Sequence, residues 1–235
     1  MTHTIPVVLE LGPKGKKVVA VAPDWPGLAR GAKSEEAAIE RLLSYAPRYA
    51  PVAKLAGMAD AFASSGAAHV DAHVDAEVNA DIIERYAGTG STDFWGISFA
   101  FSSIDQQPMT DAELARELTL MQACWTFFDN VRARVSAEMQ RGPRGGGRDR
   151  DHIVRHTFAA ERDWAKKLGV QPPEGAMLTD AGLQEHRQTY GNAIREFHAQ
   201  GKMARTWPLR FLIRHTAFHT LDHAWEMEDK DLTAQ

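Results

Sequence analysis

The chain has 235 residues, of which 44% are hydrophobic and 25% are charged, and its formal net charge is −4. These proportions are typical of a globular protein and argue against an intrinsically disordered chain. The mean hydropathy is −0.36, and no apolar run approaches the ~20 residues of a spanning helix, so we expect no membrane segment. The acidic balance argues against a nucleic-acid partner, because phosphate binding needs a concentrated basic surface.

The cysteine content and the first residues indicate the cellular compartment. Cys124 is the single cysteine, so the chain forms no internal disulfide. The lysines near the start follow a short apolar stretch, which is the opposite of the order in a signal peptide. We therefore expect a cytoplasmic protein in which Cys124, within MQACWTFF, is a buried small hydrophobe rather than a nucleophile.

Residues 1–105 predict a small α+β domain. The β-branched runs IPVVLEL and KVVAVA, joined by GPKGK, indicate a hairpin, and the prolines of PDWPGL indicate a loop after it. Ser34, followed by two glutamates, is typical of a helix N-cap. We expect Pro47 and Pro51 to interrupt this helix and a second short helix to span residues 52–63.

Two further segments of this domain have the period of a strand. Residues 68–81 alternate strictly between alanine or valine and polar or charged residues, among them His69 and His73. In FWGISFAF, residues 94–101, bulky apolar residues alternate with small ones. We therefore expect a small antiparallel sheet with one or two helices against it.

The period changes to helical beyond Pro108. Thr110 and Glu113 form the capping-box pattern TDAE, after which apolar residues recur every three or four positions. Later helices are expected over residues 151–168, from about 182 to 200, and after Pro208 to about 230. Four helices without strand signals between them predict an antiparallel four-helix bundle over residues 106–235. The whole chain is thus expected to be α+β, with a domain boundary between residues 105 and 106.

Histidines are the most informative residues of this sequence. His215, His219 and His223 lie four residues apart in the last predicted helix, and His152 and His156 repeat this spacing in the second. Neighbours at this spacing lie one turn apart, whereas the outer two of the three are ~12 Å apart along the axis. One histidine of the second helix and two neighbours of the last would leave open coordination positions, as in a catalytic metal site.

Each of these histidines also has an interpretation that involves no metal. Histidines four apart on an exposed helix are often only polar surface, but two such pairs in one bundle favour the metal site. His69 and His73 lie on the solvated side of their predicted strand among carboxylates, which favours a hydrated surface. His186 and His198 stand alone, so we expect no functional role for them.

The chain from Pro108 to its end resembles the DinB-like (DinB/YfiT) superfamily of metal-binding four-helix bundles. The segments that carry the resemblance are DHIVRHTFAAERDW on the second predicted helix and RHTAFHTLDHAWEMED on the last. The resemblance implies His156 as one metal ligand and a histidine pair on the last helix. The phrase FHTLDHAWEMED favours His219 and His223, whereas the pattern of the mycothiol-dependent isomerases in this superfamily selects His215 and His219.

The same resemblance implies a function. Members bind Zn²⁺ or Ni²⁺, transfer low-molecular-weight thiols or isomerise and hydrolyse small substrates, and often form dimers. It implies a divalent-metal-dependent enzyme that acts on a small molecule, with thiol S-transfer as one candidate reaction, and a homodimer. Asp222 and Glu226 are candidates to orient the imidazoles, and Glu161 is a candidate to orient His156 or to act as a general base. The alternative is a non-catalytic binding or dimerisation module.

The segment VVAVAPDWPGLARGAKSEEAAIERLLSYA is similar to the HicB-like sheet domain, in which a strand leads into a D-x-P-G loop and an acidic-capped helix. Because no helix-turn-helix or ribbon-helix-helix pattern accompanies it, we expect a small sheet domain rather than a DNA-binding antitoxin. The glycine-rich loop at residues 141–150 precedes the helix of His156. Its Arg144 and Arg148 are candidates to contact an anionic substrate.

Overall fold

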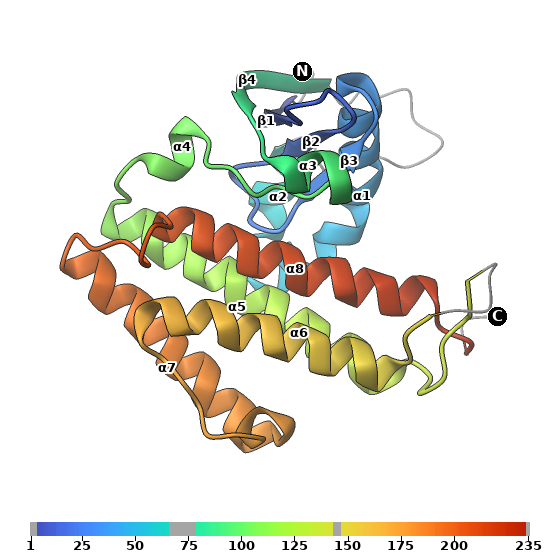
Figure 1. The fold of residues 1–235 in the computed structure, drawn as a ribbon, viewed down its shortest axis with the longest axis vertical. Coiled ribbons are helices and arrows are strands. Elements are labelled where there is room, and N and C mark those ends of the chain that lie inside the picture. The colour runs from blue at the N-terminus through green and yellow to red at the C-terminus, as the bar shows by residue number, and fades with distance from the viewer. Residues whose placement is uncertain (1–3, 66–78, 143–146, 234–235) are drawn as a thin grey trace. The chain divides into compact units, whose positions relative to one another are not determined.

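The computed structural model describes residues 4–65, 79–142 and 147–233. They form two compact units, Met1–Pro108 and Met109–Gln235 (Figure 1). The division follows Pro108, where the sequence predicted it after residue 105. The described residues combine a sheet with helices, so the prediction of an α+β protein is confirmed. Among them, every helix is too short or too polar to cross a membrane.

Unit 1 contains a mixed four-stranded sheet. Its strands are β1 (Thr4–Leu11), β2 (Val18–Val21), β3 (Ala29–Ala32) and β4 (Asn79–Ala87), in the order β3-β2-β1-β4. The predicted hairpin is confirmed, because β1 and β2 pair antiparallel. The prediction of an antiparallel sheet is wrong, because β4 lies parallel to β1. The chain passes from β3 to β4 through residues 33–78, a length that allows the crossover needed for a parallel neighbour.

The first helix of unit 1 continues through two prolines. α1 (Glu35–Leu55) begins after the predicted N-cap, Ser34, and passes Pro47 and Pro51 without a break, so the predicted interruption is wrong. A proline inside a helix costs ~3 kcal/mol or more, whereas each large apolar side chain that becomes buried contributes ~1.5–3 kcal/mol. Packing of one face of α1 therefore outweighs the prolines. The buried residues of this helix are Ala38, Leu42, Ala46, Tyr49, Val52 and Ala53.

The segment FWGISFAF does not form its predicted strand. α3 (Gly90–Trp95) covers its first two residues, and the part that follows belongs to no strand of the described sheet. Its hydrogen-bond donors go instead to the buried carboxylate of Glu10, which accepts bonds from the amides of Phe99 and Ala100 and from the hydroxyl of Ser98. A carboxylate thus replaces the strand ladder, and no sequence period reveals this.

Two short helices and the predicted strand at residues 68–81 complete unit 1. α2 (Ala59–Ser64) follows α1, and α4 (Ser103–Gln106) follows the Glu10-bound segment. Of the predicted strand, residues 79–81 begin β4, and the remainder lies outside the described residues. His69 and His73 also lie outside them.

The described residues of unit 2 form four long helices, at the places where the sequence predicted helices. They are α5 (Asp111–Arg134), α6 (Arg150–Ala165), α7 (Asp180–Ala199) and α8 (Leu209–Asp229), with short 3₁₀ turns at Lys166–Leu168 and Ala176–Leu178. The capping box of Thr110 and Glu113 at the start of α5 is confirmed. α8 packs along both α5 and α6, and α7 runs obliquely beside them (Figure 1). Cys124 is fully buried in α5, and burial raises the pKa of its thiol.

One hydrophobic core joins these helices. Each of them contributes side chains to it, and the connections before α7 and α8 add others. The buried members are Leu114, Leu118, Met121, Trp125, Ala165, Leu168, Val170, Tyr190, Ile194, Ala204, Leu209, Leu212 and Ile213. This core fixes how α6 and α8 lie against each other, and those two helices carry the grouped histidines.

Candidate metal centre

Three histidines from two helices of unit 2 lie together. His156 comes from α6, and His219 and His223 come from successive turns of α8. One ring nitrogen of each lies within 4.8 Å of those of the other two. The ring centroids are 5.1 Å apart for His156 and His219, 4.9 Å for His156 and His223, and 4.4 Å for the α8 pair. These are the three residues that the sequence predicted as metal ligands.

Helix geometry brings these side chains together. Residues four apart on one helix lie one turn apart on nearly the same face, so His219 and His223 both face the helix that packs beside α8. That helix is α6, which begins at its N-cap Asp149 and presents His156 after somewhat less than two turns. His156 is exposed, His219 is half-buried and His223 is buried. The cluster therefore has one side open to solvent.

The hydrogen bonds of His223 determine which of its nitrogens is available. Nδ1 lies 2.7 Å from Oε2 of Glu226, so the ring donates its Nδ1 proton to that carboxylate. In the neutral ring, Nε2 then carries a lone pair, and it lies 3.2 Å from Nε2 of His219. Two such nitrogens approach this closely only with a proton or a cation between them. His219 Nδ1, the other nitrogen of that ring, is buried and has no hydrogen-bond partner among the described residues.

The donor set fits a divalent transition-metal ion. Imidazole nitrogens that bind one Zn²⁺ at ~2.0–2.1 Å in tetrahedral geometry lie ~3.3 Å from each other. The separation of 3.2 Å between the Nε2 atoms of His219 and His223 matches this value. A ring nitrogen of the exposed His156 lies within 4.8 Å of a ring nitrogen of each of these two histidines. Three nitrogen ligands of this kind suit Zn²⁺, Ni²⁺, Cu²⁺ and Fe²⁺.

The electrostatics of the cluster favour neutral imidazoles. Burial lowers the pKa of His219 well below its usual value, and repulsion from His223, His215 and His156 adds to this effect. Burial and the neighbouring His223 likewise lower the pKa of His156. A metal ligand must be the neutral imidazole. The surroundings therefore keep His156 and His219 in the form that binds metal.

Glu226 is held as a carboxylate behind the cluster. Burial alone would raise its pKa, but hydrogen bonds from His223 and Lys230, together with the charge of Arg148, lower it to about 2. Arg148 contacts Oε2 at 2.9 Å, and Lys230 contacts Oε1 at 2.6 Å. The sequence predicted Glu226 as a residue that orients an imidazole, and the structure places it at His223 Nδ1, as such a role requires.

His215 lies one turn before His219 but outside the cluster. Its ring stacks on Phe211 with centroids 5.3 Å apart, and the edges of Trp164 and Trp207 meet it at 4.8 and 5.4 Å. It is 3% exposed. The structure therefore groups His219 with His223, the register that FHTLDHAWEMED favours.

Glu161 does not lie at the histidine cluster, and its predicted role as the partner of His156 is wrong. Five residues along a helix correspond to about 500°, so Glu161 and His156 point to different sides of α6. Glu161 is fully buried and pairs with Arg187 of α7, with Nε 3.2 Å from Oε1. Burial raises the pKa of Glu161, and the charge of Arg187 opposes this shift.

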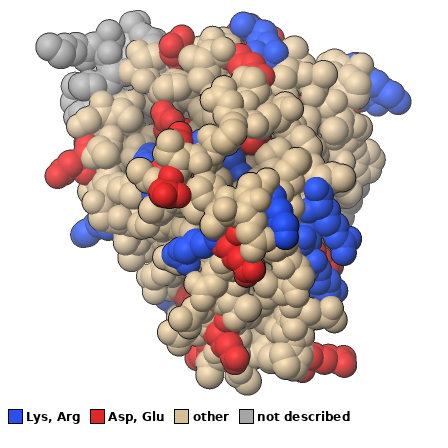
Figure 2. Space-filling view, turned by 90° about the vertical axis from the view of Figure 1, so that its left-hand side faces the viewer, with Lys and Arg blue, Asp and Glu red and all other residues tan. Residues whose placement is uncertain are grey.

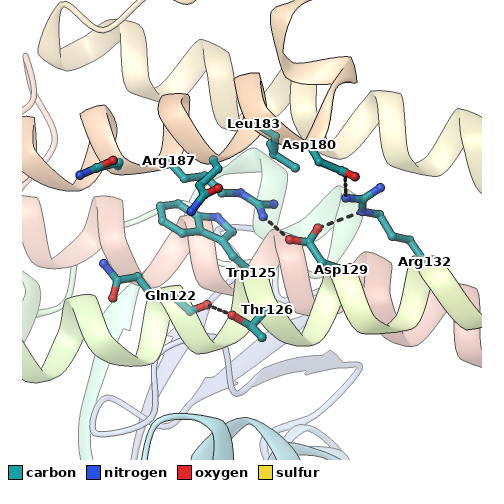
Figure 3. A pocket seen from close by; sticks show the side chains of 10 residues that line it. Gln122, Trp125, Thr126, Asp129, Arg132, Asp180, Leu183 and Arg187 are labelled. Atoms are coloured by element: carbon teal, nitrogen blue, oxygen red, sulfur yellow. Dashed lines mark hydrogen bonds and ion pairs between the residues drawn. The ribbon is translucent and has the colours of Figure 1, made fainter.

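A second polar group extends from Arg187 across the space between α5 and α7. Arg187 binds Asp129 at 2.7 Å, Asp129 binds Arg132 at 2.9 Å, and Arg132 binds Asp180 at 3.0 Å (Figure 3). These side chains line a pocket of about 710 Å³ with Trp125 and three glutamines. Its acids and bases neutralise one another, which is typical of a structural network that fastens a helix.

The remaining residues considered in the sequence, Asp222, His198 and His186, lie outside the histidine cluster. Asp222 is half-buried on α8 and is not part of the histidine cluster. His198 bonds the carbonyl of Met109 at 2.7 Å. His186 is buried beside Glu161, with its Nε2 3.7 Å from Oε1. Burial and then the charge of Arg187 lower the pKa of His186 to about 4. Sequence spacing gave no sign of this contact, because it depends on how α7 meets α6.

Comparison of the chain with protein-family models, with curated proteins and with solved structures gave no match. The resemblance to the DinB-like superfamily therefore stays a prediction that rests on the two histidine-bearing segments. The similarity of the first unit to the HicB-like sheet domain stays a prediction in the same way.

Proposed function

We propose that unit 2 is a DinB-like antiparallel four-helix bundle that holds one divalent metal ion, Zn²⁺ or Ni²⁺, on His156, His219 and His223. The observation that carries this proposal is the convergence of three imidazoles from two helices. A carboxylate behind His223 supports it, because ligating histidines commonly donate their second nitrogen proton to such a group. Neutral imidazoles at His156 and His219 support it further.

The proposed activity is that of a cytoplasmic metal-dependent enzyme on a small molecule. An ion with three protein ligands and open positions lowers the pKa of a bound water or thiol and so supplies a nucleophile at neutral pH. Thiol S-transfer, isomerisation and hydrolysis are the candidate reactions. Glu226 orients the ring of His223 and takes up no proton, because Arg148 and Lys230 hold it as a carboxylate. The open side at His156 is where substrate enters.

Arg148 extends the proposal to the charge of the substrate. Its guanidinium lies within the electrostatic reach of both His156 and His219 and is half-exposed. One of its nitrogens binds Glu226, which leaves other donors of the guanidinium for a second anion. A substrate with a carboxylate or thiolate near its reacting atom fits this position.

The competing function is a binding or dimerisation module without chemistry. In that case unit 1 recruits a partner and the histidines are polar surface. Metal affinity separates the two, because a surface cluster has no reason to bind one ion tightly. The convergence of His156 from α6 on His219 and His223 of α8 favours the metal-dependent enzyme.

Calorimetric titration of the metal-free full chain with Zn²⁺ and Ni²⁺ tests the metal site. We expect one equivalent per chain, and loss of this tight step in His156→Ala. His152→Ala is the matched control, because His152 lies four residues earlier on α6, is exposed and is outside the cluster. Equal titrations for the two variants would contradict the proposal.

A thiol titration tests the open coordination positions. The Co²⁺-loaded chain should gain a sulfur-to-metal charge-transfer band when a small thiol such as 2-mercaptoethanol is added. His223→Ala should show no such band, because the ion is no longer held. If thiols at every concentration leave the spectrum of the Co²⁺-loaded chain unchanged, thiol transfer is excluded. Hydrolysis by a metal-bound water then becomes the favoured reaction.

A further inference from the structure

Lys167, in the 3₁₀ turn after α6, lies over the ring of Trp207, which belongs to the same turn before α8 as Arg205. Among the described residues, neither Lys167 nor Arg205 has a side-chain hydrogen bond or ion pair. Burial, and then repulsion from Arg205, lower the pKa of Lys167. Several other bases of unit 2 pair with acids, as Arg210 does with Glu113. Acidic and basic groups are also intermixed on the face of the molecule in Figure 2.

The backbone at Arg205 is strained. Its φ is 57°, and it is the one residue other than glycine with a positive φ in the described chain. Arg205 is the first central residue of a tight turn in which Ala204 and Trp207 pair. Such positions favour glycine or asparagine, and an arginine there costs ~1 kcal/mol or more. Strain of this kind is characteristic of functional sites.

A row of aromatic rings connects this basic pair with the histidine cluster. Lys167 Nζ lies 4.2 Å above the centre of the Trp207 ring. Trp207 meets His215 at 5.4 Å, His215 meets Trp164 at 4.8 Å, and Trp164 meets His219 at 5.0 Å. Both tryptophans are half-buried and so keep part of their surface open. Lys167 lies in the 3₁₀ turn after α6, and the rise of the two helices places it roughly 17 Å from His156 along their axis.

We propose that Lys167 and Arg205 bind the anionic group, a carboxylate or phosphate, of a small organic molecule whose apolar part lies along Trp207 and Trp164 toward the histidine cluster. Two unpaired cations attract an anion, and bound anion would relieve their mutual repulsion. The half-buried indoles give the adjoining apolar part a surface. That this molecule is the substrate of the metal centre rests on the function proposed above, whereas the anion site itself does not.

Titration with phenyl phosphate tests the anion site, with the indole NH signal of Trp207 as the readout, assigned through Trp207→Phe. The metal-free full chain is used, with inorganic phosphate as the second ligand. We expect phenyl phosphate to shift this signal and to bind more tightly than phosphate, because the ring adds apolar contact. Lys167→Ala should weaken binding about tenfold or more. The matched control is Lys202→Ala, since Lys202 also lies over an aromatic ring, that of Phe197.

Arg205→Gly separates a binding role from a structural one. Glycine accepts the positive φ, so this variant should melt at a higher temperature and yet bind phenyl phosphate about tenfold more weakly. A melting temperature that rises while binding stays the same would overturn the role of Arg205. Equal affinities of Lys167→Ala, Lys202→Ala and the unmodified chain would overturn the site.

The direction of the bound molecule is tested on the Co²⁺-loaded chain. Paramagnetic relaxation should place the ring protons of phenyl phosphate nearer the ion than its phosphorus. The reverse order would overturn the proposed direction. The titration of phenyl phosphate uses the metal-free chain, so its outcome does not depend on a bound metal ion. A chain that binds phenyl phosphate but no metal therefore contradicts the proposed function alone. A chain that binds metal, and whose affinity for phenyl phosphate is unchanged by Lys167→Ala, contradicts this inference alone.

Discussion

At the scale of single residues, Glu226 is not itself a proposed metal ligand, but it contacts and orients one of the ligands, His223. It accepts the Nδ1 proton of His223 and is itself held by Arg148 and Lys230. We expect Glu226→Gln to weaken metal binding 10- to 100-fold, the usual range for such supporting groups. Competition with a chromophoric chelator measures this change. Glu228→Gln, on the same helix but away from His223, should bind metal as the parent does. Equal losses in both variants would argue for a general effect on α8.

His215 provides a residue-scale test of the register. It packs against Phe211, Trp164 and Trp207 outside the cluster. His215→Ala should keep one equivalent of metal and lower the free energy of unfolding by ~2–4 kcal/mol, because it leaves a cavity among buried rings. His223→Ala should lose the metal. Elemental analysis and urea unfolding of the two variants decide between the registers. The opposite result would move the site one turn toward the start of α8.

At the scale of elements, the ion pair of Glu161 and Arg187 fastens α7 to α6. Arg187→Met leaves a buried carboxyl group without its partner, and we expect unfolding to become easier by ~3–5 kcal/mol. Adding Glu161→Leu should recover most of that loss, because the pair is then replaced by apolar packing. Urea unfolding of the two variants provides the comparison. A double variant less stable than Arg187→Met would show that Glu161 supports the fold without its partner.

The helix contact at His186 makes stability depend on pH. The folded chain protonates His186 only near pH 4, whereas the unfolded chain does so near its ordinary value of 6.5. Unfolding therefore takes up a proton between these values, and stability falls as the pH falls, by on the order of 2–4 kcal/mol at pH 4. The raised pKa of Glu161 acts in the opposite direction. His186→Gln removes the first effect and keeps the second.

Urea unfolding at pH 7 and pH 5 measures this dependence. The difference between the two midpoints should be smaller in His186→Gln than in the parent. His152→Gln should keep the parent's difference, because His152 is exposed on the surface of α6. The account of His186 fails if its variant and the parent respond equally to pH.

Helices were predicted from the sequence more accurately than strands, for a physical reason. The signals of a helix are local, such as the capping box of Thr110 and Glu113, which the structure confirms. The strand expected in FWGISFAF depended on where its amides bond, and a distant carboxylate, Glu10, takes them. The prolines at 47 and 51 likewise gave a local signal that burial of α1 outweighs.

At the scale of the whole molecule, the parts of the site that sequence predicts are those fixed by spacing within one helix. The four-residue interval predicted a histidine pair on α8, and the resemblance of FHTLDHAWEMED selected His219 and His223, with Glu226 as their neighbour. Contacts between different helices could not be predicted from the sequence. Glu161 pairs with Arg187 of α7 rather than with His156, and Lys167 lies over Trp207 although forty residues separate them in the sequence. Helical phase and packing, rather than residue type, decide such contacts.

The division into two units places all three proposed ligands within one of them. The histidine cluster, its supporting carboxylate and the core that positions α6 against α8 all belong to Met109–Gln235. The proposed ligands therefore come from a single unit of the chain. The charge of Arg148 and the basic pair at Lys167 and Arg205 lie in the same unit.

Metal content of the untagged full chain, purified without added metal, tests the central claim most directly. Elemental analysis should find about one Zn²⁺ or Ni²⁺ per chain, and none in the variant with alanine at His156, His219 and His223. A control variant with alanine at His152, which is exposed on α6 and lies outside the cluster, should keep the metal. A parent chain that lacks metal and gains none on dialysis against Zn²⁺ or Ni²⁺, or a control variant that loses it equally, would contradict the metal centre.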